Sequence, residues 1–323
     1  SRPEGAFPVV EDAIRYADRD RWHRFADGRG ATLERLDPRA DSLAASNWAD
    51  SDESTKAEWT TIEVTGTLAH GNPNAPADQV QMFLLGPGEA LVDGVEVIPR
   101  GGSNVLPNGD FEGGTAGWFF QGTHRRSRHE RGDAFDGSGA LRLAATRRGD
   151  PGPNRARAPL GQTLAAGGRA TLRARVRWLA GHPEFLMRFK GNWLEAAGRL
   201  NVPTNLGTPG TRNSRALHNA GPGIELVTHR PVLPRAREPF RVTAQVTDPD
   251  GVESVRLHYR RDPSQVTTEL PMTDDGKGGD LVPGDGIYSA EVPAQANGAL
   301  IAFRVVAEDA ATAAASAIFP TEG

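Results

Sequence analysis

The sequence predicts an all-β protein built of tandem β-sandwiches. Short runs of alternating apolar and polar residues recur along the chain, whereas no window combines the i, i+3, i+4, i+7 apolar spacing of a helix with capping signals. The 323 residues include 38 Gly and 24 Pro, which punctuate strands with turns. These observations favour sandwiches of antiparallel strands. The Ala-rich stretch 308–317 is the nearest candidate for a helix.

Nine stretches show the alternation of a strand. In chain order they are Ile62–Thr65, Val80–Leu85, Leu91–Ile98, Leu141–Leu143, Leu172–Trp178, Phe185–Phe189, Phe240–Val246, Val255–Tyr259 and Ile301–Val306. Turn-rich breaks lie near 49–57, 99–104, 147–154 and 201–223. The last of these is rich in Pro and Gly, and the main domain boundary is expected there.

Charge and composition exclude several functions. The chain holds 37 basic and 41 acidic residues, so it lacks the field that attracts nucleic acid or an anionic membrane. No run of 18 apolar residues predicts a membrane span, and Ser1–Gly5 lack the features of a signal peptide. The absence of cysteine excludes disulfides and thiolate chemistry.

The stretch 171–178 predicts a strand with one basic face. Apolar residues alternate with Arg173, Arg175 and Arg177, so the arginines share one side of the strand. Phe185–Phe189 repeats the pattern, and we expect the two strands to pair. Two interpretations stay open: a solvated face kept soluble by charge, or a surface for acidic sugars or a phosphorylated partner.

No motif of a common enzyme is present. The sequence lacks a nucleophile elbow, a P-loop, a dinucleotide fingerprint and a His-Glu-x-x-His motif. His124 and His129 stand among four arginines that would repel a divalent cation; a charged loop is the simpler interpretation, and an anion-binding patch is the alternative. Glu184 and Glu195 flank the predicted basic face, but a glycosidase needs two carboxylates at a defined separation that sequence does not give.

Residues Gly28–Asp41, followed by Asn47-Trp48, resemble the closing half of a bacterial lamin-tail domain, and Val10–Tyr16 is similar to the strand before it. The final motif of such domains resembles Gly207–Ser214, much later than expected. The resemblance therefore implies an immunoglobulin-like segment over 1–57, completed by 201–220, with another domain inserted between.

The inserted block, 58–200, resembles a carbohydrate-binding jelly roll. Asn104–Gly114 with Gly117-Trp118 is similar to the opening strand of such modules, and Leu91–Val97 to their closing strand, which implies circular permutation. The resemblance implies sugar stacking on Trp118, Phe120 and Trp193, with core positions as the alternative. It also implies a structural calcium held by Asp93, Asp110 and Glu112, with ordinary turn and surface roles as the alternative.

Residues 221–323 resemble an immunoglobulin-like or fibronectin-III-like module of bacterial surface proteins. Thr247–Val252 leading into 255–259 is its hairpin signal. Four aspartates, Asp274, Asp275, Asp280 and Asp285, alternate with glycines that permit tight curvature and could wrap a calcium ion. A bare hairpin loop is the alternative.

This domain order resembles the non-catalytic part of secreted bacterial proteins that carry a CotH-like kinase domain downstream, so further domains of the same polypeptide are expected. We predict a non-enzymatic, secreted or cell-surface module that binds a polysaccharide or cell-surface glycan. Nucleic acid is not an expected partner. The alternatives are a structural or adhesive spacer and, third, a hydrolase or lyase on the jelly roll.

Overall fold

The computed structural model describes residue 14 and residues 22–69, 76–277 and 280–320. The predicted strand Val10–Tyr16 lies outside them except for Ile14. Strands make up 45% of the chain, which confirms the all-β class and its β-sandwich character. The helical turns in the described residues are short 3-10 turns, η1 (Ala45–Asn47) and η2 (Gly122–His124). Within the described part of the chain, no helix has the length and hydrophobicity to cross a membrane.

The Ala-rich stretch 308–317 is not a helix. Strand β18 (Ile301–Asp309) ends within it, and β19 (Ser316–Phe319) begins there. The carboxylate of Asp309, which is 1% exposed, accepts the N–H groups of Ala311 and Ala315 at 3.0 and 3.1 Å. An aspartate that binds the backbone of its own turn competes with helix formation.

The described chain divides into two compact units. The β3–β12 unit contains Arg24–Thr32 and Asp50–Gly210. The β13–β19 unit contains Leu33–Ala49 and Thr211–Gly323, with the described part of Ser1–His23. The strands for which we name the units lie inside the predicted ranges 58–200 and 221–323.

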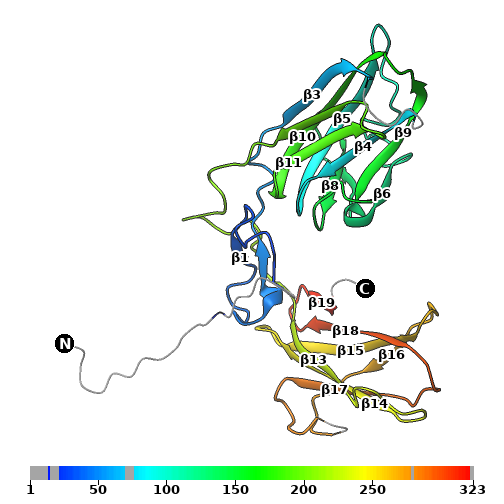
Figure 1. Ribbon diagram of the computed structural model, residues 1–323. Coiled ribbons are helices and arrows are strands. Elements are labelled where there is room, and N and C mark those ends of the chain that lie inside the picture. Colours follow the sequence, from blue (N-terminus) through cyan, green and yellow to red (C-terminus); the bar gives the residue numbers. More distant parts are fainter. Residues whose placement is uncertain (1–13, 15–21, 70–75, 278–279, 321–323) are drawn as a thin grey trace. The chain divides into compact units, whose positions relative to one another are not determined.

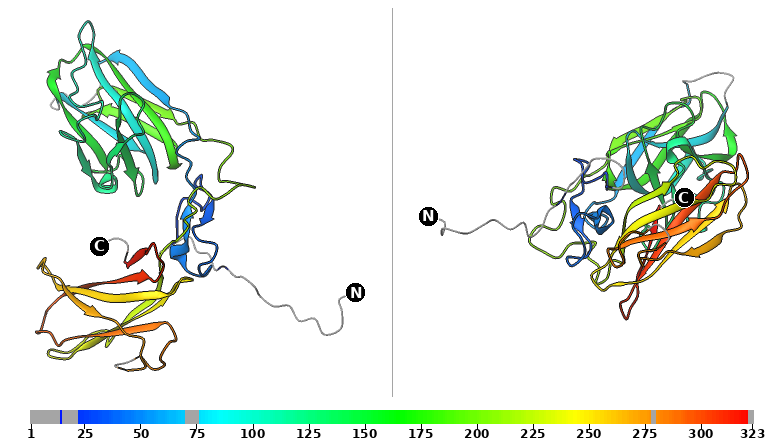
Figure 2. Two further views of the ribbon diagram at one scale, coloured as in Figure 1. Left: turned by 180° about the vertical axis from the view of Figure 1, so that it is seen from behind. Right: turned by 90° about the horizontal axis from the view of Figure 1, so that it is seen from below.

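The β3–β12 unit is a sandwich of two five-stranded antiparallel sheets (Figure 1), which Figure 2 shows from behind. We call the first the β10 sheet; in spatial order it contains β3 (Thr60–Thr67), β10 (Arg169–Gly181), β5 (Gly88–Pro99), β8 (Gly139–Ala145) and β7 (Arg128–Arg131). We call the second the β4 sheet; it contains β12 (Glu195–Arg199), β11 (Glu184–Phe189), β4 (Ala77–Leu84), β9 (Arg155–Leu164) and β6 (Phe119–Gln121).

Strand β10 shows why the sandwich forms. Leu172, Val176 and Trp178 are fully buried and point into the core, whereas the arginines between them point outward. Each large apolar side chain buried in this way contributes about 1.5–3 kcal/mol to folding. The alternation therefore fixes which side of the strand faces the opposite sheet.

The expected pairing of 171–178 with 185–189 is wrong. Strand β11 pairs with β4 and β12, whereas β10 pairs with β3 and β5 in the opposite sheet. Gly181, with φ +80°, ends β10 before the chain crosses to the other layer. Both strands carry a strongly apolar face, and the two faces are buried most completely when they meet across the core. Arg188 therefore lies on the opposite outer surface from Arg173–Arg177.

One end of this core is covered by the segment Arg24–Thr32. Gly181 N–H donates to Arg29 O at 2.8 Å, and the backbone of Gly30 lies against the Trp178 ring. A Cβ at Gly30 would come within 2.5 Å of Trp178 Cζ2. Glycine at this position permits the close approach, and its φ of +87° is one that few other residues adopt.

The β13–β19 unit contains a second sandwich, of three and four antiparallel strands. Its smaller sheet contains, in spatial order, β13 (Gly223–Arg230), β14 (Phe240–Thr247) and β17 (Ile287–Val292). Its larger sheet contains β16 (Thr268–Pro271), β15 (Val252–Arg261), β18 and β19. Val242, Leu257 and Val305 are fully buried in its core.

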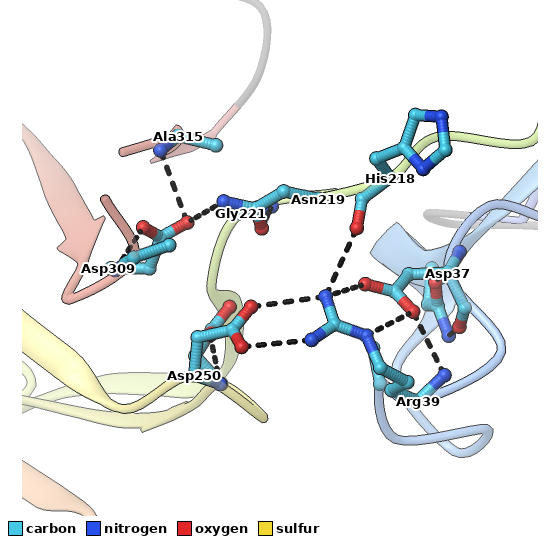
Figure 3. Close-up of polar contacts among 12 residues, drawn as sticks. Asp37, Arg39, His218, Asn219, Gly221, Asp250, Asp309 and Ala315 are labelled. Atoms are coloured by element: carbon cyan, nitrogen blue, oxygen red, sulfur yellow. Dashed lines mark hydrogen bonds and ion pairs between the residues drawn. The ribbon is translucent and has the colours of Figure 1, made fainter. Parts of the chain in front are cut away.

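A small two-stranded sheet, β1 (Leu33–Arg35) and β2 (Trp48–Asp50), precedes the second sandwich in the chain. Arg39, which follows β1, lies between Asp37 and Asp250 (Figure 3). Its guanidinium donates two bonds to Asp250, at 2.8 and 3.0 Å, and one to His218 O at 3.0 Å. It also lies 2.8 Å from Asp37 Oδ2. Arg39 thus links three separate stretches of the β13–β19 unit.

Segments 1–57 and 201–220, which carry the lamin-tail resemblance, contact each other in both units. In the β13–β19 unit, Ser214 Oγ donates to buried Glu34 at 2.6 Å. In the β3–β12 unit, Gly207 N–H donates to buried Glu53 at 2.8 Å, and Lys56 Nζ lies 2.8 Å from the same carboxylate. The insertion itself stays a prediction.

Candidate functional site

Three arginines share the outer face of the β10 sheet because side chains alternate along a strand. Arg173, Arg175 and Arg177 are partly buried, and the residues between them are fully buried in the core. The three guanidinium groups have different partners.

Arg173 forms ion pairs with residues of the two neighbouring strands. Glu63 of β3 and Glu96 of β5 stand opposite it in register. Its guanidinium pairs with Glu63 and lies 3.0 Å from Glu96 Oε2. The hydrogen bonds to Glu63 and Glu96 raise the pKa of Arg173 above its ordinary value. Its charge is therefore balanced within the sheet, as in the solvated-face interpretation.

Arg175 and Arg177 lie against two aromatic rings that sequence reasoning did not select. The Arg175 guanidinium is 5.0 Å from the centre of the Phe135 ring, and that of Arg177 is 5.1 Å from the Trp59 ring. The rings meet edge to face, with centres 5.8 Å apart. Phe135 is 48% exposed although it is a large apolar side chain. We call Trp59, Phe135, Arg175 and Arg177 the aromatic site.

Polar groups surround the aromatic site. Arg175 Nη1 donates to Thr61 Oγ1 at 2.9 Å, and Arg177 pairs with Asp133. The arrangement offers an exposed ring together with hydroxyl, guanidinium and carboxylate groups. A ring of this kind presents an apolar face, and the surrounding groups supply hydrogen-bond donors and acceptors for a polar ligand.

Two carboxylates predicted to bind calcium instead hold the loop that carries Phe135. Asp93, which is 1% exposed, accepts N–H bonds from Phe135 and Asp136 at 2.9 and 3.0 Å. Glu112 accepts N–H bonds from Ser138 and Gly139, both at 2.8 Å. Burial raises the pKa of Asp93 despite its backbone donors, whereas the backbone donors lower the pKa of Glu112.

Asp93, Asp110 and Glu112 do not form a group of three ligand oxygens suited to a metal. Asp110 is exposed, and the other two carboxylates are occupied by backbone N–H groups of one loop. The structure therefore does not bring the three carboxylates together, and Asp93 and Glu112 hold the loop that carries the aromatic site.

The aromatic residues predicted to stack on sugar face the core instead. Trp118 is 6% exposed; its ring centre lies 5.3 Å from that of Phe111, and its Nε1 donates to Asn108 O at 2.9 Å. Phe120 and Trp193 are partly buried and pack against the same core. The alternative interpretation, in which these rings are core residues, fits their surroundings.

The aspartate-rich loop does bring three carboxylates together. Oxygens of Asp274, Asp280 and Asp285 all lie within 4.8 Å of one another. Asp280 is 3% exposed, whereas Asp275 stands apart and accepts the N–H of Lys277 at 3.1 Å. Asp274 also accepts backbone N–H bonds from Gly284 and Gly286, at 2.6 and 2.8 Å. Hard carboxylate oxygens of this kind suit calcium.

Glu184 and Glu195 do not form the facing pair that a glycosidase requires. Glu195 of β12 stands opposite Arg188 of β11 in register. Arg188 is four positions from Glu184 along β11. Four residues of a strand span about 13 Å, whereas paired glycosidase carboxylates lie about 5–9.5 Å apart. The two glutamates are instead bound locally: Glu184 lies 3.1 Å from His182, and Glu195 lies 3.3 Å from Arg188.

Comparison with known proteins assigns no family to this chain, because no protein-family model and no curated protein matches it. The lamin-tail, jelly-roll and CotH-associated resemblances stay predictions. Functional conclusions therefore rest on the geometry of the sites.

Proposed function

We propose that this chain is a non-enzymatic glycan-binding module whose aromatic site holds a sugar ring against Phe135. The exposure of Phe135 carries the proposal, because this phenyl ring is 48% exposed although the Arg175 guanidinium lies over it, and polar groups surround the ring. The C–H face of a pyranose is complementary to such a ring, and its hydroxyls are complementary to the rim.

Each residue of the site has a distinct part in this proposal. Phe135 supplies the stacking face, and Trp59 fixes it edge to face. Arg175 and the Asp133 carboxylate supply a donor and an acceptor for sugar hydroxyls. Asp93 holds the backbone of Phe135 in place, so the ring is positioned before a ligand arrives. Such preorganisation reduces the entropy cost of binding.

Affinity electrophoresis of the chain against neutral and acidic polysaccharides tests the proposal. We expect retardation by at least one glycan, and we expect Phe135→Ala to weaken it about tenfold or more, which corresponds to about 1.4 kcal/mol. Leu226→Ala is the control, since Leu226 is a 72% exposed apolar side chain on β13, outside the β3–β12 unit. Equal losses in both variants, or no retardation of the unmodified chain, would overturn the proposal.

A structural spacer is the competing function, and one observation favours it. Leu91, on the outer face opposite Arg177, is only 1% exposed, so the site also covers an apolar residue. If Phe135 serves only as a cover, Phe135→Ala lowers the unfolding temperature and no glycan retards either protein. This outcome separates the two functions.

We further propose that Asp274, Asp280 and Asp285 hold calcium, and that the chain works as part of a larger secreted or cell-surface protein. The proximity of the three carboxylates supports the metal site, since a cation would offset their mutual repulsion. Extracellular calcium modules bind with dissociation constants of about 0.1–1 mM, so such a site fills outside the cell.

A calcium titration tests this second proposal. We expect calcium to raise the unfolding temperature of the β13–β19 unit with a midpoint of about 0.1–1 mM. Asp280→Asn should remove the shift, while Asp275→Asn, the matched control in the same loop, should retain it. If the unfolding temperature of the unmodified chain does not change at a calcium concentration about 10-fold above this range, the proposed site is contradicted.

A further inference from the structure

The outer face of the β4 sheet carries two arginines, Arg155 and Arg157, without a carboxylate partner among the described residues, whereas Arg188 on the same face pairs with Asp150 and Glu195. In register, Arg188 of β11, Gln81 of β4, Arg157 of β9 and Phe119 of β6 form one row across four strands. Arg155 stands two positions from Arg157 on the same face, opposite Gln121. This row lies on the side of the sandwich opposite to the aromatic site.

Arg155 and Arg157 have no carboxylate partner among the described residues. Arg157 donates to Gln121 Oε1 at 3.0 Å, and its guanidinium lies 4.7 Å from the centre of the Phe119 ring. The Nε of Arg155 is buried and makes no hydrogen bond within the described protein. Burial lowers the pKa of Arg155, and the nearby Arg157 and Arg188 lower it further, while Asp150 acts in the opposite direction. Arg173 of the other sheet, by contrast, has two glutamate partners.

The segments around this face add further positive charge. Residues 119–127 and 146–154 contain four further arginines and one carboxylate, that of Asp150. Asp150 already pairs with Arg188 at 2.5 Å. Hydrogen bonds join the two segments, with Thr146 N–H donating to Thr123 O at 3.0 Å and Thr123 N–H to Asn154 Oδ1 at 3.1 Å. Arg125, Arg147 and Arg148 are exposed in these bordering loops.

Neutral polar groups on the face favour a ligand that carries hydroxyl groups as well as anionic groups. Gln121, which is partly exposed, stands beside the arginines, and an amide side chain both donates to and accepts from hydroxyl groups. Gln81 is buried beneath them. Phe119 is the one aromatic side chain in the row, and Arg157 lies against its ring. Single-stranded nucleic acid is usually bound by several stacking rings along a groove, which the row lacks.

We propose that this face, which we call the arginine face, is a second binding site and takes an acidic polysaccharide. Arg155 and Arg157 bind its carboxylate or sulfate groups through paired N–H donors, while Gln121 binds a hydroxyl of a neighbouring sugar. Arg155 and Arg157 lie two positions apart on β9, about 7 Å along the strand, so a ligand on this face meets two cations without a carboxylate partner. Arg188, one strand further, is already paired with Asp150 and Glu195.

Binding to three immobilised probes at about 0.15 M salt tests the arginine face: heparin for sulfate, polygalacturonate for carboxylate and dextran as the neutral polymer. We expect heparin or polygalacturonate to bind, and the one that binds more tightly identifies the anionic group. The double variant Arg155→Gln/Arg157→Gln should bind at least tenfold more weakly. Arg100→Gln/Arg169→Gln removes the same charge from exposed positions at the edge of the other sheet and should change binding less than twofold.

Several outcomes would overturn this inference. Equal losses in the two double variants would show that only net charge matters. Tighter binding of a single-stranded oligonucleotide, lost in the same variant, would reassign the face to nucleic acid. Absence of binding to either acidic polymer, with unchanged circular dichroism, would exclude it. The outcome is independent of the glycan proposal above, because Phe135→Ala leaves the arginine face intact.

Discussion

At the scale of single residues, buried polar side chains are bound to particular backbone groups. His124 is fully buried, and its Nε2 accepts the N–H of Leu84 at 3.0 Å. Because Nε2 is an acceptor, the proton of the neutral ring lies on Nδ1, 3.1 Å from Thr123 Oγ1. Burial lowers the pKa of His124 to about 4 from the ordinary 6.5. The histidine is a structural acceptor, not a metal ligand.

This histidine predicts acid sensitivity of the β3–β12 unit. Between pH 6.5 and about 4 the unfolded chain binds a proton on His124 and the folded chain does not, so the free energy of unfolding falls as the pH falls through this window. The loss amounts to about 3 kcal/mol and is complete below pH 4. Urea unfolding at several pH values measures it. His124→Gln should flatten the dependence, whereas His182→Gln, at a partly exposed position, should leave it in place.

The sites show which residue properties a sequence reveals. Alternation along 171–178 correctly predicted that Arg173, Arg175 and Arg177 share one face, because strand geometry is local. It could not predict that Trp59 and Phe135 meet there, since their contact depends on the fold of a loop held by Asp93. The burial of Trp118 could not be predicted from the sequence either, because it depends on how the rest of the sandwich packs around this side chain.

At the scale of elements, all nine predicted strands coincide with strands of the structure. The strands that were missed have weak patterns. β9 alternates arginine with small alanines and contains Pro159, and β12 contains two alanines and a glycine. Such residues have low strand propensity, and neighbouring strands supply the stabilisation instead. Pairing was harder to predict than strand position, as β10 and β11 show.

The stretch Asn104–Trp118 contains no strand, so the expectation of an opening strand there is wrong; it forms a series of turns. Asn108, at φ 52°, donates from Nδ2 to Gly114 O and Ala116 O at 3.0 and 2.9 Å. We expect Asn108→Ala to lower the free energy of unfolding by about 1–3 kcal/mol, because two carbonyls lose their donor. Chemical denaturation measures the change.

Asn192 provides the control for that measurement. It has a similar φ of 59°, but its side chain has no hydrogen bond within the described protein. Asn192→Ala should therefore cost only the backbone strain, about 1 kcal/mol. Equal costs at the two positions would mean that the side-chain bonds of Asn108 contribute nothing.

At the scale of the whole molecule, Arg39 joins distant stretches of the β13–β19 unit. We expect Arg39→Gln to speed hydrogen exchange over residues 36–47, because buried Asp37 and Asp250 both lose their cation. Although burial acts to raise it, the pKa of Asp37 is lowered by its bonds to Arg39, so the link weakens as the pH falls below the ordinary value of 3.8.

Arg256 is the matched control in the same unit. Its guanidinium lies 3.6 Å from Glu269 and 3.9 Å from Glu308, and all three side chains are largely exposed. Exposed pairs of this kind contribute about 0–1 kcal/mol. Arg256→Gln should therefore leave hydrogen exchange over 36–47 unchanged, and faster exchange there in both variants would show that Arg39 has no special role.

Because Gly30 covers Trp178, the choice of first residue matters when the β3–β12 sandwich is expressed as a separate fragment. A fragment cut at residue 58, where the sequence suggests a domain edge, keeps every strand from β3 to β12 but leaves the ring of Trp178 open to water. An exposed indole at the end of a sheet invites aggregation. A soluble fragment for binding studies should therefore begin before Arg24, so that the segment that seals the core is retained.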